Sequence, residues 1–295
     1  MMTLKRKKNK MEIKASQVKE LRDMTGVAMM ECKKALVECS GDIEKALDLL
    51  RSNSALKAEK KAARVAADGV LRVHVGDDYS TLIEINSETD FAAKDENFIK
   101  FADDVQKFIS ENKLTDIADI QASEVEDKRK ALVQTIGENI QLRRLETIEY
   151  SSEMNTSSYV HSDSKLGSIV VISGGDETLA KDIAMHVAAF NPLCLSEADI
   201  DPEILEREKA IYMVQAEESG KPQEIMEKMI EGKLKRFLSE VSLLSQNFVK
   251  DPEVTIQNLL DSNNAKIESY TRLKVGEGIE VETKNFADEV AEQLK

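Results

Sequence analysis

Tryptophan is absent from this 295-residue chain, and aromatic residues make up only 4% of it. Hydrophobic residues still account for 41%, so the chain can bury enough apolar surface to fold. We therefore expect cores built from aliphatic side chains and from the 11 methionines. The length is sufficient for two or three domains.

Long apolar segments are also missing. No window approaches the 18 or more apolar residues of a membrane-spanning helix, and the N-terminus has no apolar stretch of signal-peptide type. There are only three cysteines. Cys32 and Cys39 lie seven positions apart on a predicted helix, about 10.5 Å along its axis, which is too far for a disulfide. With Cys194, they are interpreted as small buried residues in a reducing compartment. We expect a cytoplasmic protein that binds no membrane.

Acidic residues outnumber basic ones, above all outside the N-terminus. The net charge is −14, and five of the 41 basic residues lie in residues 1–10, MMTLKRKKNK. The rest of the chain is therefore more acidic than the net charge indicates. Such a surface repels phosphate backbones, which argues against direct binding of nucleic acid. Residues 1–10 are interpreted as a disordered basic tail or an upstream start.

Motifs that carry chemistry are missing as well. The chain has no glycine-rich phosphate loop ending in Lys-Ser/Thr, and no serine lies in a nucleophile-elbow context. Its histidines, His74, His161 and His186, form no His-x-x-x-His pattern, and no Cys-x-x-Cys pair occurs. We therefore expect no metal, no cofactor and no catalytic residue. An acidic α+β hydrolase or transferase is the weakest alternative.

Hydrophobic periodicity predicts an α+β fold. Residues 14–52 show three runs of helical spacing, with breaks at Thr25-Gly26 and at Ser40-Gly41-Asp42. After residue 68 the pattern changes to two alternating strands, then helices, then a β-capable run near residues 140–150. The same order recurs after residue 156, interrupted by a helical hairpin whose apolar residues include Ile211 and Val214. Residues 266–275 alternate again and are predicted to complete the second sheet.

These patterns give the following divisions. In chain order they are a basic tail (1–10), a three-helix module (11–55), a charged linker helix (56–67), a first α+β subdomain (68–155), a second, related α+β subdomain (156–201 and 245–285), an inserted helical hairpin (202–244) and a C-terminal helix (286–295).

The segment Thr89–Lys94 follows a strand and precedes a helix, which places it at a loop tip. Composition alone favours a structural interpretation, in which Asp90 caps a helix and Phe91 staples against it. The functional interpretation is an aromatic anchor offered to a partner beside a carboxylate.

Five segments stand out as motifs: TGVAMMECKKAL (Thr25–Leu36), TDFAAK (Thr89–Lys94), IGEN (Ile136–Asn139), IAMHVAA (Ile183–Ala189) and VGEGIE (Val275–Glu280). In these segments the chain resembles the elongation factor Ts family. The resemblance runs in order from about Met11 to the C-terminus. One departure is Ala92, where the family usually has valine; the smaller side chain weakens local packing more than it alters the direction of the loop.

The resemblance implies a ubiquitin-associated-like N-terminal module, a core of two related subdomains and a protruding coiled-coil hairpin. It also implies a guanine-nucleotide exchange factor of translation elongation, which is not an enzyme. Such a protein binds elongation factor Tu in its GDP-bound and nucleotide-free forms, disturbs the Mg²⁺ and phosphate site, and promotes GDP release. Because the family includes monomers and dimers, a homodimer through the core remains open.

Carried onto this chain, the resemblance assigns the exchange wedge to Asp90 and Phe91, with Thr89 beside them. It assigns further partner contacts to Met30 and Lys33 in the N-terminal module, and to His161 near the first strand of the second subdomain. The main alternative is an adaptor that binds its partner through the N-terminal module alone. That alternative predicts that residues 11–55 bind the partner by themselves and that Phe91 has no effect.

Overall fold

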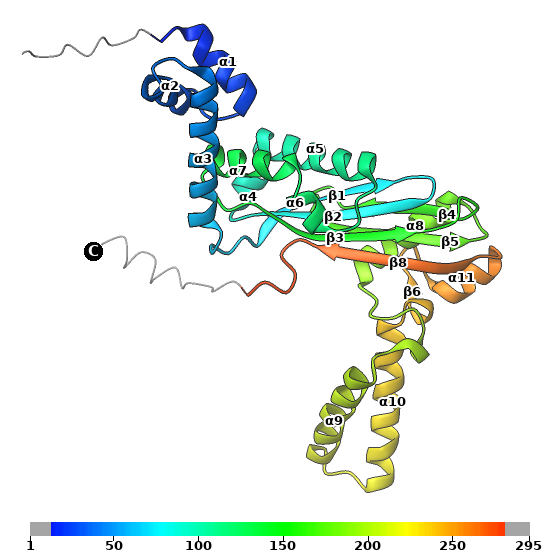
Figure 1. Cartoon of the computed structure of the whole chain (residues 1–295). Helices are drawn as coiled ribbons and strands as arrows, with labels where there is room; N and C mark the ends of the chain where they lie inside the picture. Colours follow the sequence, from blue (N-terminus) through cyan, green and yellow to red (C-terminus); the bar gives the residue numbers. More distant parts are fainter. Residues whose placement is uncertain (1–12, 281–295) are drawn as a thin grey trace, which may run out of the picture. The chain divides into compact units, whose positions relative to one another are not determined.

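The computed structural model describes residues 13–280 (Figure 1). The expected basic tail and C-terminal helix lie outside the described residues. Within them the chain divides into two units, one formed by residues 13–72, 83–145 and 275–280, the other by residues 73–82 and 146–274. No helix of the described part is both long and apolar enough to span a bilayer.

Three helices form the N-terminal module of the first unit: α1 (Ala15–Thr25), α2 (Met29–Glu38) and α3 (Ile43–Lys61). Asp42, in the predicted break, caps α3, where its side chain accepts the Lys45 backbone N–H at 3.1 Å. Burial of aliphatic side chains between the helices stabilises the module, at about 1.5–3 kcal/mol for each large one. The buried residues are Val18, Leu21, Val27, Cys32, Ala35, Leu36, Ala46 and Leu50.

Helix α3 differs from the expected division at residues 55 and 56. The module's third helix and the linker helix are one continuous helix of 19 residues that ends at Lys61. No glycine or proline interrupts the sequence there, and the Ser54 hydroxyl donates to the Leu50 carbonyl oxygen within the helix, at 2.9 Å, instead of capping a new one. The C-terminal half of α3 lies beside α7 (Glu124–Ile136). The same hydroxyl also forms a hydrogen bond with the Gln134 side chain of α7. The N-terminal module therefore packs, through α3, against α7 in the rest of the first unit.

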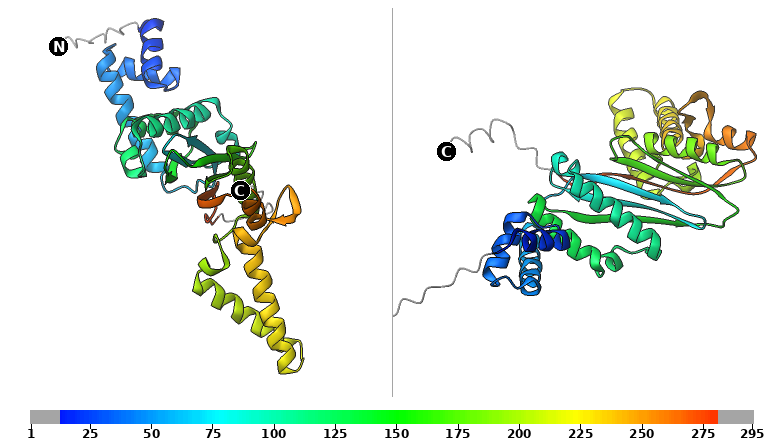
Figure 2. Two further views of the ribbon diagram at one scale, coloured as in Figure 1. Left: turned by 90° about the vertical axis from the view of Figure 1, so that its right-hand side faces the viewer. Right: turned by 90° about the horizontal axis from the view of Figure 1, so that it is seen from above.

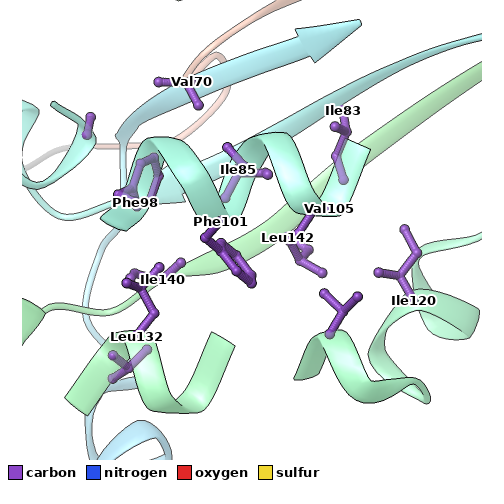
Figure 3. Packing of buried hydrophobic residues seen from close by; sticks show 14 of the residues in the cluster. Val70, Ile83, Ile85, Phe98, Phe101, Val105, Ile120, Leu132, Ile140 and Leu142 are labelled. Carbon is purple, nitrogen blue, oxygen red and sulfur yellow. The ribbon is translucent and has the colours of Figure 1, made fainter. Parts of the chain in front are cut away.

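Three strands, β1 (Asp68–Val75), β2 (Tyr79–Ser87) and β3 (Gln141–Glu149), form a sheet in the order β1-β2-β3. Helices α5 (Glu96–Asn112), α6 (Ile117–Gln121) and α7 supply apolar side chains that pack against it (Figure 3). The apolar spacing of α5 places Phe98, Phe101, Val105 and Ile109 in this core. The β-capable run predicted near residues 140–150 is confirmed as β3, and it follows helix α7.

A buried carboxylate lies in the middle of β2. Glu84 is fully buried and pairs with Arg143 at 3.0 Å and with Arg144 at 2.5 Å. It also accepts hydrogen bonds from the Asn86 side chain at 2.9 Å and from the Gly276 backbone N–H at 2.8 Å. Burial by itself raises the pKa of Glu84, but these donors outweigh it and hold the pKa below the ordinary 4.5.

The segment after residue 274 is fastened to the first unit at this carboxylate. Gly276 has a φ of +74°, and a Cβ added there would lie 2.2 Å from the carbonyl oxygen of Ala67. Only glycine fits that close approach. Arg143 also donates to the Glu277 carbonyl oxygen at 2.6 Å, so Glu84 and Arg143 together hold residues 276 and 277.

In the second unit, β4 (Asn155–Val160), β5 (Leu166–Ser173) and β8 (Lys266–Lys274) form an antiparallel sheet in the order β4-β5-β8. The strand predicted over 266–275 is thereby confirmed. Helix α8 (Glu177–Phe190) packs against this sheet. The sequence did not predict the smaller elements, which are η1 (Glu197–Asp199), η2 (Leu243–Ser245), β6 (Asn247–Phe248), β7 (Asp251–Thr255) and α11 (Ile256–Ser262).

Helices α9 (Pro202–Glu218) and α10 (Gln223–Val241) form the predicted helical hairpin, which extends away from the β4-β5-β8 sheet (Figures 1 and 2). Its contact face differs from the one indicated by the apolar spacing. Ile211 and Val214 are 42% and 55% exposed, whereas Ala216 is buried. Lys233 of α10 lies over the Tyr212 ring of α9, 5.5 Å from its centroid. The hairpin contact is therefore partly polar, and α9 carries a second, uncovered apolar face.

Candidate protein-binding site

Phe91 is the most exposed of the large apolar side chains in the described residues, with 82% of its surface accessible. It lies in α4 (Asp90–Ala93), a helix of only four residues between β2 and α5. The next two residues, Ala92 and Ala93, are buried and anchor the turn. The structural interpretation, in which Phe91 packs on its own helix, is therefore wrong, because the turn directs the ring to solvent.

The cap of α4 also differs from the structural interpretation. Thr89, not Asp90, is the N-cap, and its hydroxyl accepts the Ala92 N–H at 3.3 Å. The Glu138 carboxylate accepts both the Thr89 backbone N–H, at 2.9 Å, and the Thr89 hydroxyl, at 2.7 Å. Threonine is a preferred N-cap because its oxygen satisfies an otherwise unpaired N–H of the first turn. The loop that carries Phe91 is thus held at its N-terminal end.

Asp90 has a cationic neighbour on the same turn. Its carboxylate lies 2.7 Å from the Lys94 ammonium, and both side chains are substantially exposed. The hydrogen bond to Asp90 raises the pKa of Lys94. Because the two charges nearly cancel at a distance, Asp90 can act as an uncompensated anion on a partner only when Lys94 moves aside.

Met30 and Lys33 are both exposed on α2. Met30 is 64% exposed, and two other methionines of the module, Met24 and Met29, are 57% and 50% exposed. Met24 lies near the end of α1, and Met29 is the first residue of α2. Methionine adapts its shape to irregular partners, so this surface suits contact with another protein.

His161 lies in the second unit, just after β4, at the start of the turn that leads into β5. It is exposed, and its Nδ1 lies 2.9 Å from the Tyr159 hydroxyl. This hydrogen bond orients the imidazole ring, and which group donates depends on the tautomer of the ring.

The other histidines serve the fold. His186 is fully buried, accepts the Val249 N–H on Nδ1 at 3.2 Å, and faces the Gln246 side-chain oxygen at 3.0 Å. Burial lowers its pKa and keeps the ring neutral. His74 packs against Tyr79 with ring centroids 5.5 Å apart. Among the described residues, no three His, Cys, Asp or Glu side chains are grouped so that they could hold a metal ion.

Sequence reasoning missed two features of the site. Glu138 supports the Phe91 loop from 49 positions away, and the only signal for it was the Ile136–Asn139 segment, to which no role was given. The exposed apolar pair Phe190 and Leu193, at the end of α8, had no signal at all; they are 49% and 51% exposed. Contacts between distant loops and the exposure of single side chains depend on the tertiary structure.

An exposed aromatic on a capped turn, exposed methionines and an oriented histidine are features typical of proteins that act by contacting another protein. The sequence profile of the family described as elongation factor TS matches residues 88–277. The chain belongs to this elongation factor Ts family.

The relatives cover nearly the whole chain. A protein of Hahella chejuensis named elongation factor Ts is 51% identical over 285 residues, which is 96% of this chain and 99% of the relative. One of Thioalkalivibrio sulfidiphilus with the same name is 47% identical over 292 residues, or 97% and 99% of the two chains. One of Francisella tularensis subsp. novicida is 48% identical over 289 residues, or 96% and 99%.

Proposed function

We propose that this chain promotes GDP release from elongation factor Tu by inserting Phe91 beside the Mg²⁺ and phosphate site of that GTPase. Guanine-nucleotide exchange on elongation factor Tu in translation elongation is the function of the elongation factor Ts family, to which the chain belongs. The observation that supports the wedge is the 82% exposure of Phe91 on a short, capped turn. A protein without a partner for that ring would gain by burying it.

The wedge acts on the geometry of the metal site. Mg²⁺ requires nearly ideal octahedral coordination, so displacing the elements that hold it by about an ångström weakens its binding. The role of Asp90 is conditional. Its carboxylate opposes the phosphates electrostatically once Lys94 has been drawn to another group, since the ion pair of the free protein is nearly neutral.

Phe91 alone does not provide enough free energy. Burying one phenylalanine yields about 1.5–3 kcal/mol, whereas shifting a two-state equilibrium from 1:99 to 99:1 needs about 5.5 kcal/mol of differential affinity. We assign the remainder to distributed contacts, which include Met30 and Lys33 on α2, His161, and the far side of the GTPase engaged by the hairpin. The differential affinity needed to release GDP therefore requires an interface much larger than the Phe91 loop.

Linkage constrains the nucleotide states of the partner. Whatever factor this protein removes from the affinity of elongation factor Tu for GDP, GDP removes from the affinity of the complex. The chain should therefore bind the nucleotide-free GTPase most tightly, bind the GDP form more weakly, and leave when nucleotide returns.

The remaining parts of the proposal concern architecture and setting. We interpret α1–α3 as the ubiquitin-associated-like module of the family, α9–α10 as its coiled-coil hairpin, and the two sheets as its related subdomains. The divisions are those given above, except that α3 runs through the one at residues 55 and 56. We further propose that the chain is not an enzyme, uses no cofactor, contacts no nucleic acid and works in the cytoplasm. A homodimer through the core remains compatible with the family.

Stopped-flow release of a fluorescent GDP analogue from elongation factor Tu tests the proposal. The wild type should accelerate release, and Phe91→Ala should lose about ten- to hundredfold of the acceleration, the equivalent of burying one phenylalanine. Leu56→Ala, which removes another exposed, large apolar side chain of the first unit, is the matched control.

Three outcomes separate the alternatives. If GDP release is fast with both the wild type and Phe91→Ala, the exchange function is supported and the wedge role of Phe91 is wrong. If the wild type has no effect on release, the exchange function itself is wrong. If residues 11–55 alone bind the partner and Phe91 has no effect, the adaptor interpretation is correct.

A further inference from the structure

Two loops of the first unit are locked together by a reciprocal pair of carboxylates. Glu138 accepts the backbone N–H and the hydroxyl of Thr89, at 2.9 Å and 2.7 Å. In the opposite direction, Glu88 accepts the Asn139 backbone N–H at 2.6 Å. Each loop, the one before Phe91 and the one of residues 137–139, therefore supplies one carboxylate that accepts hydrogen bonds from the other loop.

The second loop is fastened in turn to the end of α3. The Asn139 side chain is buried and donates to the carbonyl oxygens of Ala62, at 3.3 Å, and Arg64, at 2.8 Å. The Lys61 ammonium donates to the Gly137 carbonyl oxygen. The wedge loop is thus connected, through residues 137–139, to the helix that belongs to the N-terminal module.

These bonds matter because the turn that carries Phe91 cannot hold its shape alone. A helix of four residues is far shorter than an isolated helix needs to be stable in water, and the exposed ring gains nothing from packing. The Thr89 hydroxyl links the two sides: it accepts the Ala92 N–H of the turn and donates to Glu138. Fixing this loop before association reduces the conformational entropy lost on binding.

We propose that Glu138 is the positioning residue of the wedge: acting through Thr89, it holds the turn that aims Phe91 at the partner. The inference rests on the proposed function and adds a residue that never touches the nucleotide site. Because Glu138 acts only by positioning the Phe91 ring, its contribution to GDP release should disappear when that ring is removed.

The experiment measures GDP release from elongation factor Tu at increasing concentrations of Glu138→Ala, Phe91→Ala and the double variant. Glu138→Ala should lower the maximal release rate about three- to tenfold, which corresponds to the loss of hydrogen bonds at a partly exposed site. In the Phe91→Ala background it should have almost no further effect, since residues that act as one unit are not additive. Glu138→Gln should recover most of the rate, because its amide can accept the Thr89 N–H and donate to the Thr89 hydroxyl oxygen.

Glu124→Ala is the matched control. Glu124 makes a charge-assisted hydrogen bond of 2.6 Å to Lys128 in the same unit, on the surface of α7, and its loss should leave the release rate unchanged. Hydrogen exchange at the Thr89 N–H gives a readout that needs no partner: exchange should be faster in Glu138→Ala than in the wild type. If Glu138→Ala does not fold, Thr89→Val replaces it, with Thr89→Ser as the rescuing variant.

Two results would overturn the inference: a wild-type release rate with Glu138→Ala, or an undiminished effect of Glu138→Ala in the Phe91→Ala background. The second would show that Glu138 acts on the whole unit. A wild-type protein that fails to accelerate release would overturn the proposed function instead. The Thr89 exchange rate would then still report whether Glu138 orders the loop.

Discussion

Glu84 is the most consequential buried charge of the first unit, and replacing it by glutamine tests how the segment after β8 is held. The substitution keeps the shape of the side chain and removes its charge. Arg143 and Arg144 then lose their shared anion, while the Gly276 N–H can still donate to the amide oxygen.

The expected loss of stability follows from the exposure of the two arginines. Removing one partner of a buried ion pair costs about 3–5 kcal/mol. Because the side chains of Arg143 and Arg144 are 22% and 27% exposed, water can partly solvate them, and we expect the lower end, about 3 kcal/mol. That corresponds to a fall of roughly 6–12 °C in the unfolding midpoint.

Thermal unfolding followed by circular dichroism measures this loss, and hydrogen exchange at Gly276 shows where it arises. Glu149→Gln, at the exposed end of β3, is the control for removing one negative charge. If Glu84→Gln leaves both the midpoint and the exchange rate of Gly276 unchanged, the buried carboxylate does not fasten this segment, and the reasoning is refuted.

Three further predictions concern single side chains. Burial lowers the pKa of His186 below 6.5, so on acidification the unfolded chain takes up a proton that the folded chain does not. The free energy of unfolding should therefore be fully retained above pH 6.5 and should fall below it. Urea unfolding midpoints measured on either side of that pH test this, and His186→Asn should show a smaller decline. Gly276→Ala should lower the urea midpoint more than Gly278→Ala does, since both glycines have positive φ but only the first would meet a backbone oxygen. Tyr159→Phe keeps the ring and frees His161, so stopped-flow GDP release should slow about two- to tenfold, and an unchanged rate would show that the orientation of His161 is unimportant.

Local patterns in the sequence predicted most of the secondary structure. The change from helical spacing to alternation after residue 68 located the first sheet, and the alternation over 266–275 located β8. Both signals depend on burying one face of an element, which the chain encodes over a few neighbouring residues. The division expected at residues 55 and 56 was not found, since α3 continues through it to Lys61.

The features that the sequence did not reveal depend on distant parts of the chain. Periodicity grouped Ile211 and Val214 with the hairpin contact, but the packing of α9 on α10 leaves both exposed. Whether Phe91 would be packed or exposed could not follow from its neighbours, because a hydrophobic staple and an exposed anchor have the same local sequence. The support from Glu138 joins residues that are 49 positions apart, and no local pattern encodes such a pair.

The order of the β4-β5-β8 sheet has a consequence for synthesis on the ribosome. Strand β5 ends at Ser173, and its second neighbour, β8, begins only at Lys266, about ninety residues later. At ordinary rates of translation the edge of β5 waits roughly 5–20 s for its partner, while α9 and α10 emerge and can fold from local contacts. During that interval the nascent chain displays an unpaired and largely apolar strand edge. During synthesis the second unit therefore needs protection from aggregation at this strand edge.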